Sequence, residues 1–112
     1  MAFSDLQAGR FRHALKERDG VITKRMMGGL IFMLNGNMVG GVDRDPSGAG
    51  RFMFRVGPDG ISTALARPGC TQVSMGGRIM KGFVFVADCD DAALESWVEL
   101  ALAYVDHLPP KA

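Results

Sequence analysis

Cysteine and histidine are scarce in this sequence of 112 residues, which contains two of each. Cys70 and Cys89 lie far apart and lack the CxxC spacing of metal and redox motifs, and His13 and His107 are scattered elsewhere. A structural zinc ion needs about four such ligands at short spacing. We therefore expect two reduced structural thiols, no metal and no other cofactor.

Long hydrophobic runs are also missing. The longest stretch without a polar side chain covers residues 26–34 and includes two glycines, whereas a membrane-spanning helix needs about 18 or more apolar residues. The first residues lack the basic segment followed by an apolar one that marks a secretory signal peptide. The sequence thus predicts a cytoplasmic protein that does not enter a membrane.

Neither sign of charge is in large excess, because 13 lysines and arginines oppose 12 aspartates and glutamates, for a net charge of +1. This balance argues against a general binder of polyanions. Residues 88–112 alone are acidic, which is typical of a solvated helix face but also fits an acidic docking surface. With 47% hydrophobic residues, the length predicts one globular domain over residues 1–112.

Motifs of catalysis and phosphate binding are absent as well. The glycine pairs at 40–41 and 76–77 are not followed by the lysine and the helix that a phosphate loop requires. Asp88, Asp90 and Asp91 precede the last predicted helix, where a carboxylate serves as a cap. Cys70 follows a helix, whose dipole at that end raises a thiol pKa and disfavours a nucleophile. We therefore expect no enzymatic activity.

The spacing of apolar residues predicts three helices and about six strands. Ser4 is suited to cap a first helix over residues 4–16, and Asp90 or Asp91 to cap a last one that ends near His107. Pro58 opens a short middle helix, which stops before Pro68. The predicted strands cover residues 21–27, 29–34, 38–42, 51–56, 73–75 and 79–86.

Tight turns connect these strands. Asn35-Gly36 tolerates positive φ at both central positions and predicts a two-residue hairpin, as does Gly76-Gly77, and residues 45–48 predict a wider reversal. Gly82 inside the last strand suggests a bulge or a close backbone approach. Residues 83–86 are all apolar, which predicts a central strand covered on both faces.

The fold class follows from this order. Residues 51–56 alternate between two sets that face opposite ways, Phe52, Phe54 and Val56 against Arg51, Met53 and Arg55, and so predict a half-buried strand. We expect an α+β fold with an antiparallel sheet of about five to six strands, arranged as a meander plus a hairpin. An N-terminal helix, a short middle helix and a long C-terminal helix complete it.

Basic side chains on the predicted strands form the strongest local hint of a binding surface. If they converge on one sheet face, they make a positive stripe that can meet phosphates or an acidic protein. They also fit solubilising charges on edge strands. The candidate partner-binding residues are Lys24, Arg25, Arg51, Arg55, Arg78 and Lys81.

The eight methionines, including Met26, Met27, Met33, Met38 and Met53, are more typical of core filling than of copper binding, and they also suit adaptable partner contacts.

Apolar strands in a small sheet leave edges that pairing would cover. A homodimer formed at these edges is therefore possible from the sequence.

Several short motifs occur here in an order that resembles a known family. They are residues 24–30 (KRMMGGL), 54–58 (FRVGP), 64–68 (ALARP), 80–84 (MKGFV), 97–98 (WV) and 108–111 (LPPK), together with Phe32 and Asn35-Gly36. This order, from about Phe11 to Lys111, is similar to the N-terminal domain of the TfoX/Sxy family of bacterial competence regulators. Met27 stands where that family usually has phenylalanine, a swap between apolar side chains.

The resemblance implies a regulatory function. Members of the family are thought to act as coactivators beside a global transcription factor, and full-length members carry a second, C-terminal helical domain. We therefore expect a stand-alone copy of the N-terminal domain, without that second domain, which acts as a non-enzymatic module of transcriptional regulation through protein–protein contacts. The alternative hypothesis is direct nucleic-acid binding through the basic sheet face.

Overall fold

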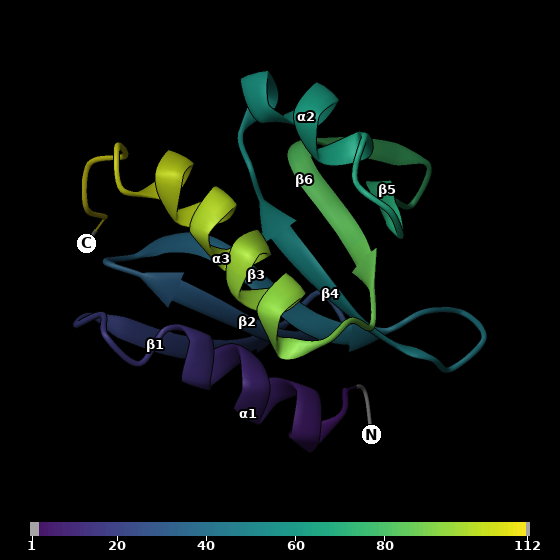
Figure 1. Cartoon of the computed structure of the whole chain (residues 1–112), viewed down its shortest axis with the longest axis horizontal. Coiled ribbons are helices and arrows are strands. Elements are labelled where there is room, and N and C mark those ends of the chain that lie inside the picture. The colour runs from purple at the N-terminus through teal and green to yellow at the C-terminus, as the bar shows by residue number, and fades with distance from the viewer. Residues whose placement is uncertain (1–2, 112) are drawn as a thin grey trace.

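A single antiparallel sheet of six strands carries three α-helices in the computed structural model, which describes residues 3–111 apart from the side chain of Met75 (Figure 1). The α+β class and the meander with a final hairpin are confirmed. The elements are α1 (Asp5–Ala14), β1 (Val21–Met26), β2 (Gly29–Leu34), β3 (Asn37–Arg44), β4 (Gly50–Arg55), a 3₁₀ turn (Pro58–Gly60), α2 (Ile61–Leu65), β5 (Cys70–Met75), β6 (Arg78–Ala87) and α3 (Asp91–Val105).

Local chemistry explains where the long helices start. The Ser4 side chain accepts a hydrogen bond of 3.2 Å from the amide of Gln7, and Asp90 accepts one of 2.8 Å from the amide of Ala93. Both caps satisfy amides that a helix leaves free in its first turn. Each of these helices ends about two residues before its predicted end, and within residues 3–111 none of the helices is long and apolar enough to cross a bilayer.

The strands follow the order β1-β2-β3-β4-β6-β5, so β1 and β5 form the two edges. Three of the connections are two-residue turns in which both residues have positive φ, at Met27-Gly28, Asn35-Gly36 and Gly76-Gly77. Such turns match the twist of a hairpin. Asn35-Gly36 and Gly76-Gly77 confirm the predicted hairpins, whereas Met27 adopts a conformation that usually favours glycine or asparagine.

One face of the sheet lies under α1 and α3 and holds the main core. The Phe11 ring of α1 stacks on Phe32 at 4.5 Å between centroids and on Phe54 at 5.5 Å, and Phe54 also stacks on Trp97 of α3 at 5.5 Å. Gly40 lies across the strands from Phe32 and Phe54. A methyl group on Gly40 would strike the carbonyl oxygen of Met53 and approach Phe11 within 3.1 Å. The aromatic stack therefore requires a residue without a side chain at position 40.

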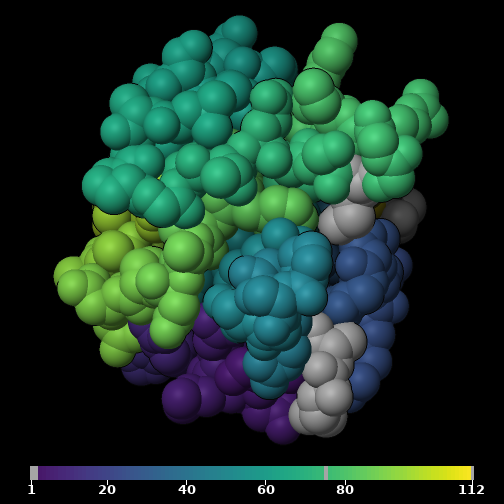
Figure 2. All heavy atoms as spheres, turned by 90° about the vertical axis from the view of Figure 1, so that its right-hand side faces the viewer, coloured from purple at the N-terminus to yellow at the C-terminus, as the bar shows by residue number. Residues whose placement is uncertain are grey.

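The other face of the sheet, called the second face below, is also buried over much of its area. Its cluster joins Ile31 and Met33 of β2 with Val73 of β5, although three strands separate β2 from β5 in the sheet. The β5–β6 hairpin must therefore curl toward the first strands, and Figure 2 shows it in green next to the blue atoms of that region. Met53 is only 4% exposed as a result, so this side of β4 is covered more fully than the sequence predicted at Met53, while Arg51 and Arg55 are only partly buried.

Gly82 makes this curl possible. Its φ of +84° and a register shift between β5 and β6 mark a bulge, and its backbone accepts hydrogen bonds from the amides of Val56 and Gly57. A methyl group here would lie 3.1 Å from the carbonyl carbon of Gly57. The bulge and the close backbone approach predicted for Gly82 are both confirmed. Strand β6, which contains Gly82, is an interior strand covered on both faces, as predicted, but its neighbour β5 is an edge strand.

Candidate interaction surface

The register of β4 decides where its two arginines lie. Phe52 and Phe54 belong to the core under the helices, so Arg51 alternates onto the second face, as the sequence predicted, whereas Arg55 at the end of β4 reaches a ring of α3. The Arg51 guanidinium donates hydrogen bonds of 2.8 and 3.2 Å to the Asp43 carboxylate, and it lies 3.5 Å from the centre of the Phe85 ring. Its charge is thus compensated within the fold, which gives Arg51 a structural role of its own.

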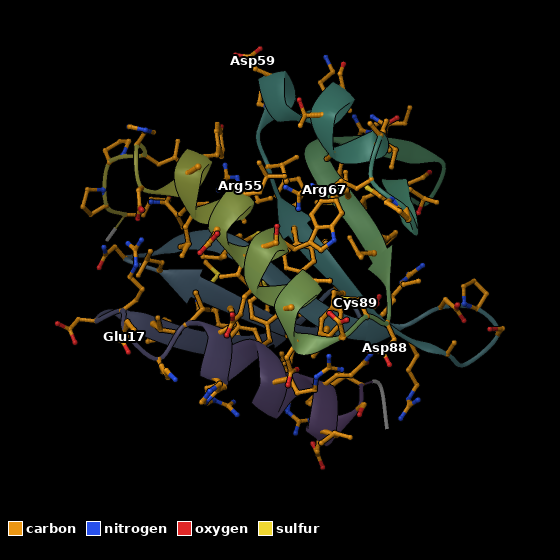
Figure 3. The ribbon with its side chains drawn as sticks, in the orientation of Figure 1. Glu17, Arg55, Asp59, Arg67, Asp88 and Cys89 are labelled. Atoms are coloured by element: carbon orange, nitrogen blue, oxygen red, sulfur yellow. The ribbon has the colours of Figure 1, made fainter. Side chains whose placement is uncertain are left out.

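Arg55 lies where β4 ends beside α3 (Figure 3). Its guanidinium is 5.6 Å from the ring centres of both Phe83 and Tyr104, one on the sheet and one on the helix. Such contacts of a cation with ring faces are worth about 0.5–1 kcal/mol when exposed. Arg55 therefore bridges the sheet and α3 while it remains partly accessible.

Lys24 and Arg25 are neighbours in β1, so their side chains lie on opposite faces of the sheet. Lys24 pairs with Ile31, a residue of the second face, whereas Arg25 pairs with Leu30 and lies 5.3 Å from the Phe3 ring on the side of the helices. The six candidate residues therefore do not converge on one surface. Arg25 is separated from Lys24 by the thickness of the sheet.

Arg78 and Lys81 lie on the hairpin that curls toward the second face, and both are exposed. Within residues 3–111, no hydrogen bond, ion pair or ring contact engages the side chains of Lys24, Arg78 or Lys81. These three side chains are exposed and unengaged, whereas the β4 arginines are partly buried and held by contacts within the fold.

Methionine lines much of the second face. Met33 and Met53 are buried in its cluster, and Met27, Met38 and Met80 pack against it, which confirms the core role expected for most methionines. Met26 at the β1 edge is 39% exposed, and Ile22 on the same strand face is 53% exposed. Ile22, Lys24 and Met26 occupy alternate positions of β1, so strand periodicity places them on one face, where they form an exposed apolar strip interrupted by a cation.

The carboxylates at the junction of β6 and α3 connect α1 to that junction. Arg10 of α1 donates hydrogen bonds of 2.9 Å to Asp88 and 2.8 Å to Asp91, and it also bonds the carbonyl of Cys89. Figure 3 places Asp88 and Cys89 where β6 passes into α3. Partial burial raises the pKa of Asp88, but hydrogen bonds from Gln7 and Arg10 outweigh burial and hold this pKa below its usual value. Within residues 3–111, no group of three or more His, Cys, Asp or Glu side chains could hold a metal ion.

Both cysteines are free and half-buried. Burial raises the pKa of the Cys70 thiol, against the opposing charge of Arg67, and burial also raises the pKa of Cys89. A raised thiol pKa agrees with the sequence prediction for Cys70, but its main cause is burial and not the helix dipole. Both thiols are thus poor nucleophiles at neutral pH.

Comparison with known proteins gives one match. The sequence model of the TfoX N-terminal domain matches residues 13–105 of the 112-residue chain. No curated protein and no solved structure matches the chain at a significant level. The match covers most of the chain, from the last turn of α1 to the last residue of α3. This chain therefore belongs to the TfoX N-terminal domain family.

Proposed function

We propose that this protein is a non-enzymatic regulatory module that acts in competence-type transcriptional control, in the cytoplasm, through contacts with a partner protein. The observation that carries the proposal is the family match over residues 13–105. Family membership indicates a competence-related regulatory role, and the proposal adds the mode of action.

The accessible cations and the apolar strip support a protein partner. Lys24 is exposed between Ile22 and Met26 on β1, and Arg78 and Lys81 are exposed on β6 on either side of Met80, which packs against the methionine cluster. This part of the molecule thus offers both charge and adaptable apolar contact. A partner that fits would carry acidic side chains around an apolar centre. Arg51 contributes less, because Asp43 already neutralises it.

The test is capture of a partner by the tagged full chain from the cytoplasm of its source cell, followed by an affinity measurement with the purified partner. Lys24→Glu/Lys81→Glu should weaken that affinity at least about tenfold by charge repulsion. The matched control, Arg12→Glu/Lys111→Glu, changes the net charge equally on other surfaces and should bind normally. Equal weakening by both pairs would contradict the proposed surface.

Direct nucleic-acid binding is the alternative, and salt dependence separates the two. Phosphate contacts make the logarithm of affinity fall steeply with the logarithm of salt concentration, while a mainly apolar interface responds weakly. We expect no shift of duplex DNA by the protein at low salt. A salt-sensitive shift that Lys24→Glu/Lys81→Glu abolishes would overturn the proposal in favour of nucleic-acid binding.

A further inference from the structure

Strand β1 forms one edge of the sheet and is open to solvent along its length (Figure 1). Val21, its first residue, is half-buried, and the five residues that follow are all exposed. The other edge strand, β5, carries no charged side chain, and its Val73 is fully buried. Of the two edges, β1 is therefore the one that presents both an exposed backbone and charge.

The backbone of β1 offers every second residue to this open side. In a hairpin with a two-residue turn, the pair next to the turn exchanges hydrogen bonds, here Met26 with Gly29, and bonded pairs alternate from there. The Asn35 amide donates to the Gly20 carbonyl at 3.1 Å, which continues the same even-numbered set. The N–H and C=O groups of the odd-numbered positions therefore point away from β2, and within residues 3–111 no hydrogen bond engages them. These positions are Val21, Thr23 and Arg25.

The charge of this edge is positive and has no acidic counterpart beside it. Residues 20–42 contain Lys24 and Arg25 but no aspartate or glutamate, and the nearest acids before them are Glu17 and Asp19, in the connection from α1. In the described part of the chain, 3–111, neither Lys24 nor Arg25 forms an ion pair, although Arg25 lies over the Phe3 ring. The two cations lie on opposite faces of β1, so a strand paired with β1 meets one positive charge on each face.

These features disfavour two other occupants of the edge. A second copy of β1 would add two more cations to the same place, and like charges on paired strands repel. Lysine on an edge strand protects a protein from pairing with its own copies in this way. A duplex of nucleic acid offers phosphates, but it has no row of alternating donors and acceptors for the free backbone groups of β1. An acidic polypeptide in extended conformation supplies both.

We propose that β1 binds an extended acidic segment of the partner protein, which adds to the sheet as an antiparallel seventh strand. This inference rests on the proposed function, because it specifies how that partner docks. Each partner residue lies opposite one residue of β1 and on the same face. Acidic residues match Arg25 and Lys24, and a polar residue matches Thr23. Apolar residues match Met26 and Ile22, so the partner sequence reads apolar, acidic, acidic, polar, apolar.

The test is NMR titration of the isotope-labelled full chain with the peptide SLEETLS, which has this pattern. We expect saturable shifts of amide signals in β1, with half-saturation below about 1 mM, and slower hydrogen exchange at Val21, Thr23 and Arg25. The control peptide SLKKTLS, in which lysines replace the acids, should leave these signals in place. Absence of binding by SLEETLS overturns the proposal, as does equal binding of the two peptides.

Pairing through the backbone is tested with N-methylated peptides, which leave the protein unchanged. A methyl group on the amide of the first glutamate of SLEETLS removes an N–H that faces Arg25, so binding should weaken at least about tenfold. The matched control carries the methyl group on the second glutamate, whose N–H points away from β1, and should bind within about threefold of the parent peptide. Equal binding of the two methylated peptides would show that charge alone holds the peptide and would overturn strand addition.

Thr23→Pro is the corresponding change in the protein. Proline removes the outward N–H of Thr23 without breaking a bond to β2, and edge strands tolerate proline at such positions. Binding of SLEETLS should weaken at least about tenfold, whereas Thr23→Val keeps this N–H and should bind like wild type. Equal binding of SLEETLS by Thr23→Pro and Thr23→Val would contradict the proposal.

The same variants separate this inference from the proposed function. If Thr23→Pro binds the captured partner normally while Lys24→Glu/Lys81→Glu binds it weakly, the proposed surface stands and strand addition is wrong. If SLEETLS binds β1 in the expected manner but no partner is captured, strand addition stands and the proposed function is contradicted.

Discussion

The two faces of the sheet are both buried, but they are built from different side chains. The face under α1 and α3 contains stacked rings, with Phe11, Phe32 and Phe54 fully buried. The second face contains methionines, branched aliphatic residues and the Phe85 ring, and it is covered by the curl of the β5–β6 hairpin. Rings pack in few geometries, whereas methionine adapts to irregular space. The comparison teaches that the ring-filled face tolerates few packing arrangements, whereas the methionine-rich face can accommodate more of them.

The largest expected effect comes from Gly40, which lies beneath the stacked rings of the face under α1 and α3. Gly40→Ala places a methyl group against the Met53 carbonyl and the Phe11 ring, so strands or rings must shift. We expect a loss of about 3 kcal/mol in the free energy of unfolding, measured by urea denaturation, at the upper end of the usual overpacking cost. Gly9→Ala is the control, because it adds a methyl group in open space and should stabilise α1 by up to about 1 kcal/mol. A neutral Gly40→Ala would contradict the rigid packing of this face.

The second prediction compares the faces with one substitution each. Phe54→Leu removes ring contacts with Phe11, Phe52 and Trp97, each worth about 0.5–1.5 kcal/mol, and should cost about 2 kcal/mol. Met53→Leu, at the neighbouring position on the second face, keeps volume and polarity and should cost less than about 1.5 kcal/mol. Urea denaturation of both variants measures the difference. Equal losses would remove the distinction drawn between the faces.

The third prediction compares the two ion-pair clusters. In the first pair, the side chains of Asp43 and Arg51 are 14% and 21% exposed. In the second pair, the Asp88 side chain, which binds Arg10 of α1, is 60% exposed. Asp43→Asn should therefore cost about 1 kcal/mol, because it weakens a half-buried pair that stacks on Phe85. Asp88→Asn should cost about 0.5 kcal/mol or less. Thermal unfolding of the two variants provides the measurement, and the reverse order would show that exposure does not govern these pairs.

Local signals in the sequence were sufficient for most of the fold. Ser4, Asn35-Gly36 and the apolar spacing of α3 each act within a few residues, and the structure confirms what they predicted. Gly82 was informative for the same reason, because positive φ is a property of one residue. The curl of the β5–β6 hairpin depends on contacts between β2 and β5, about 40 residues apart in the chain, and no local pattern encodes it.

The candidate surface was predicted less well than the fold. Strand alternation alone separates Lys24 from Arg25, because neighbouring residues of a strand face opposite sides of the sheet. The pairing of Arg51 with Asp43 requires the register between β3 and β4, which the loop after Arg44 sets. Whether Lys24, Arg78 and Lys81 bind a partner stays a prediction, as does the absence of enzymatic activity.

The smallest expected effect is the loss of the Asp88 contribution to stability at low pH. Hydrogen bonds from Gln7 and Arg10 hold the pKa of Asp88 below its usual value of 3.8 in the folded protein, despite partial burial that raises it. The unfolded chain therefore binds a proton at Asp88 more readily than the folded protein does as pH falls. The contribution of Asp88 to stability is complete above its unfolded pKa and is lost as pH falls through the lower folded pKa. The difference in unfolding free energy between wild type and Asp88→Asn should stay constant from about pH 7 to 5 and shrink below about pH 4. A difference that persists unchanged in acid would show that Asp88 holds α1 to the start of α3 by hydrogen bonds that do not need its charge.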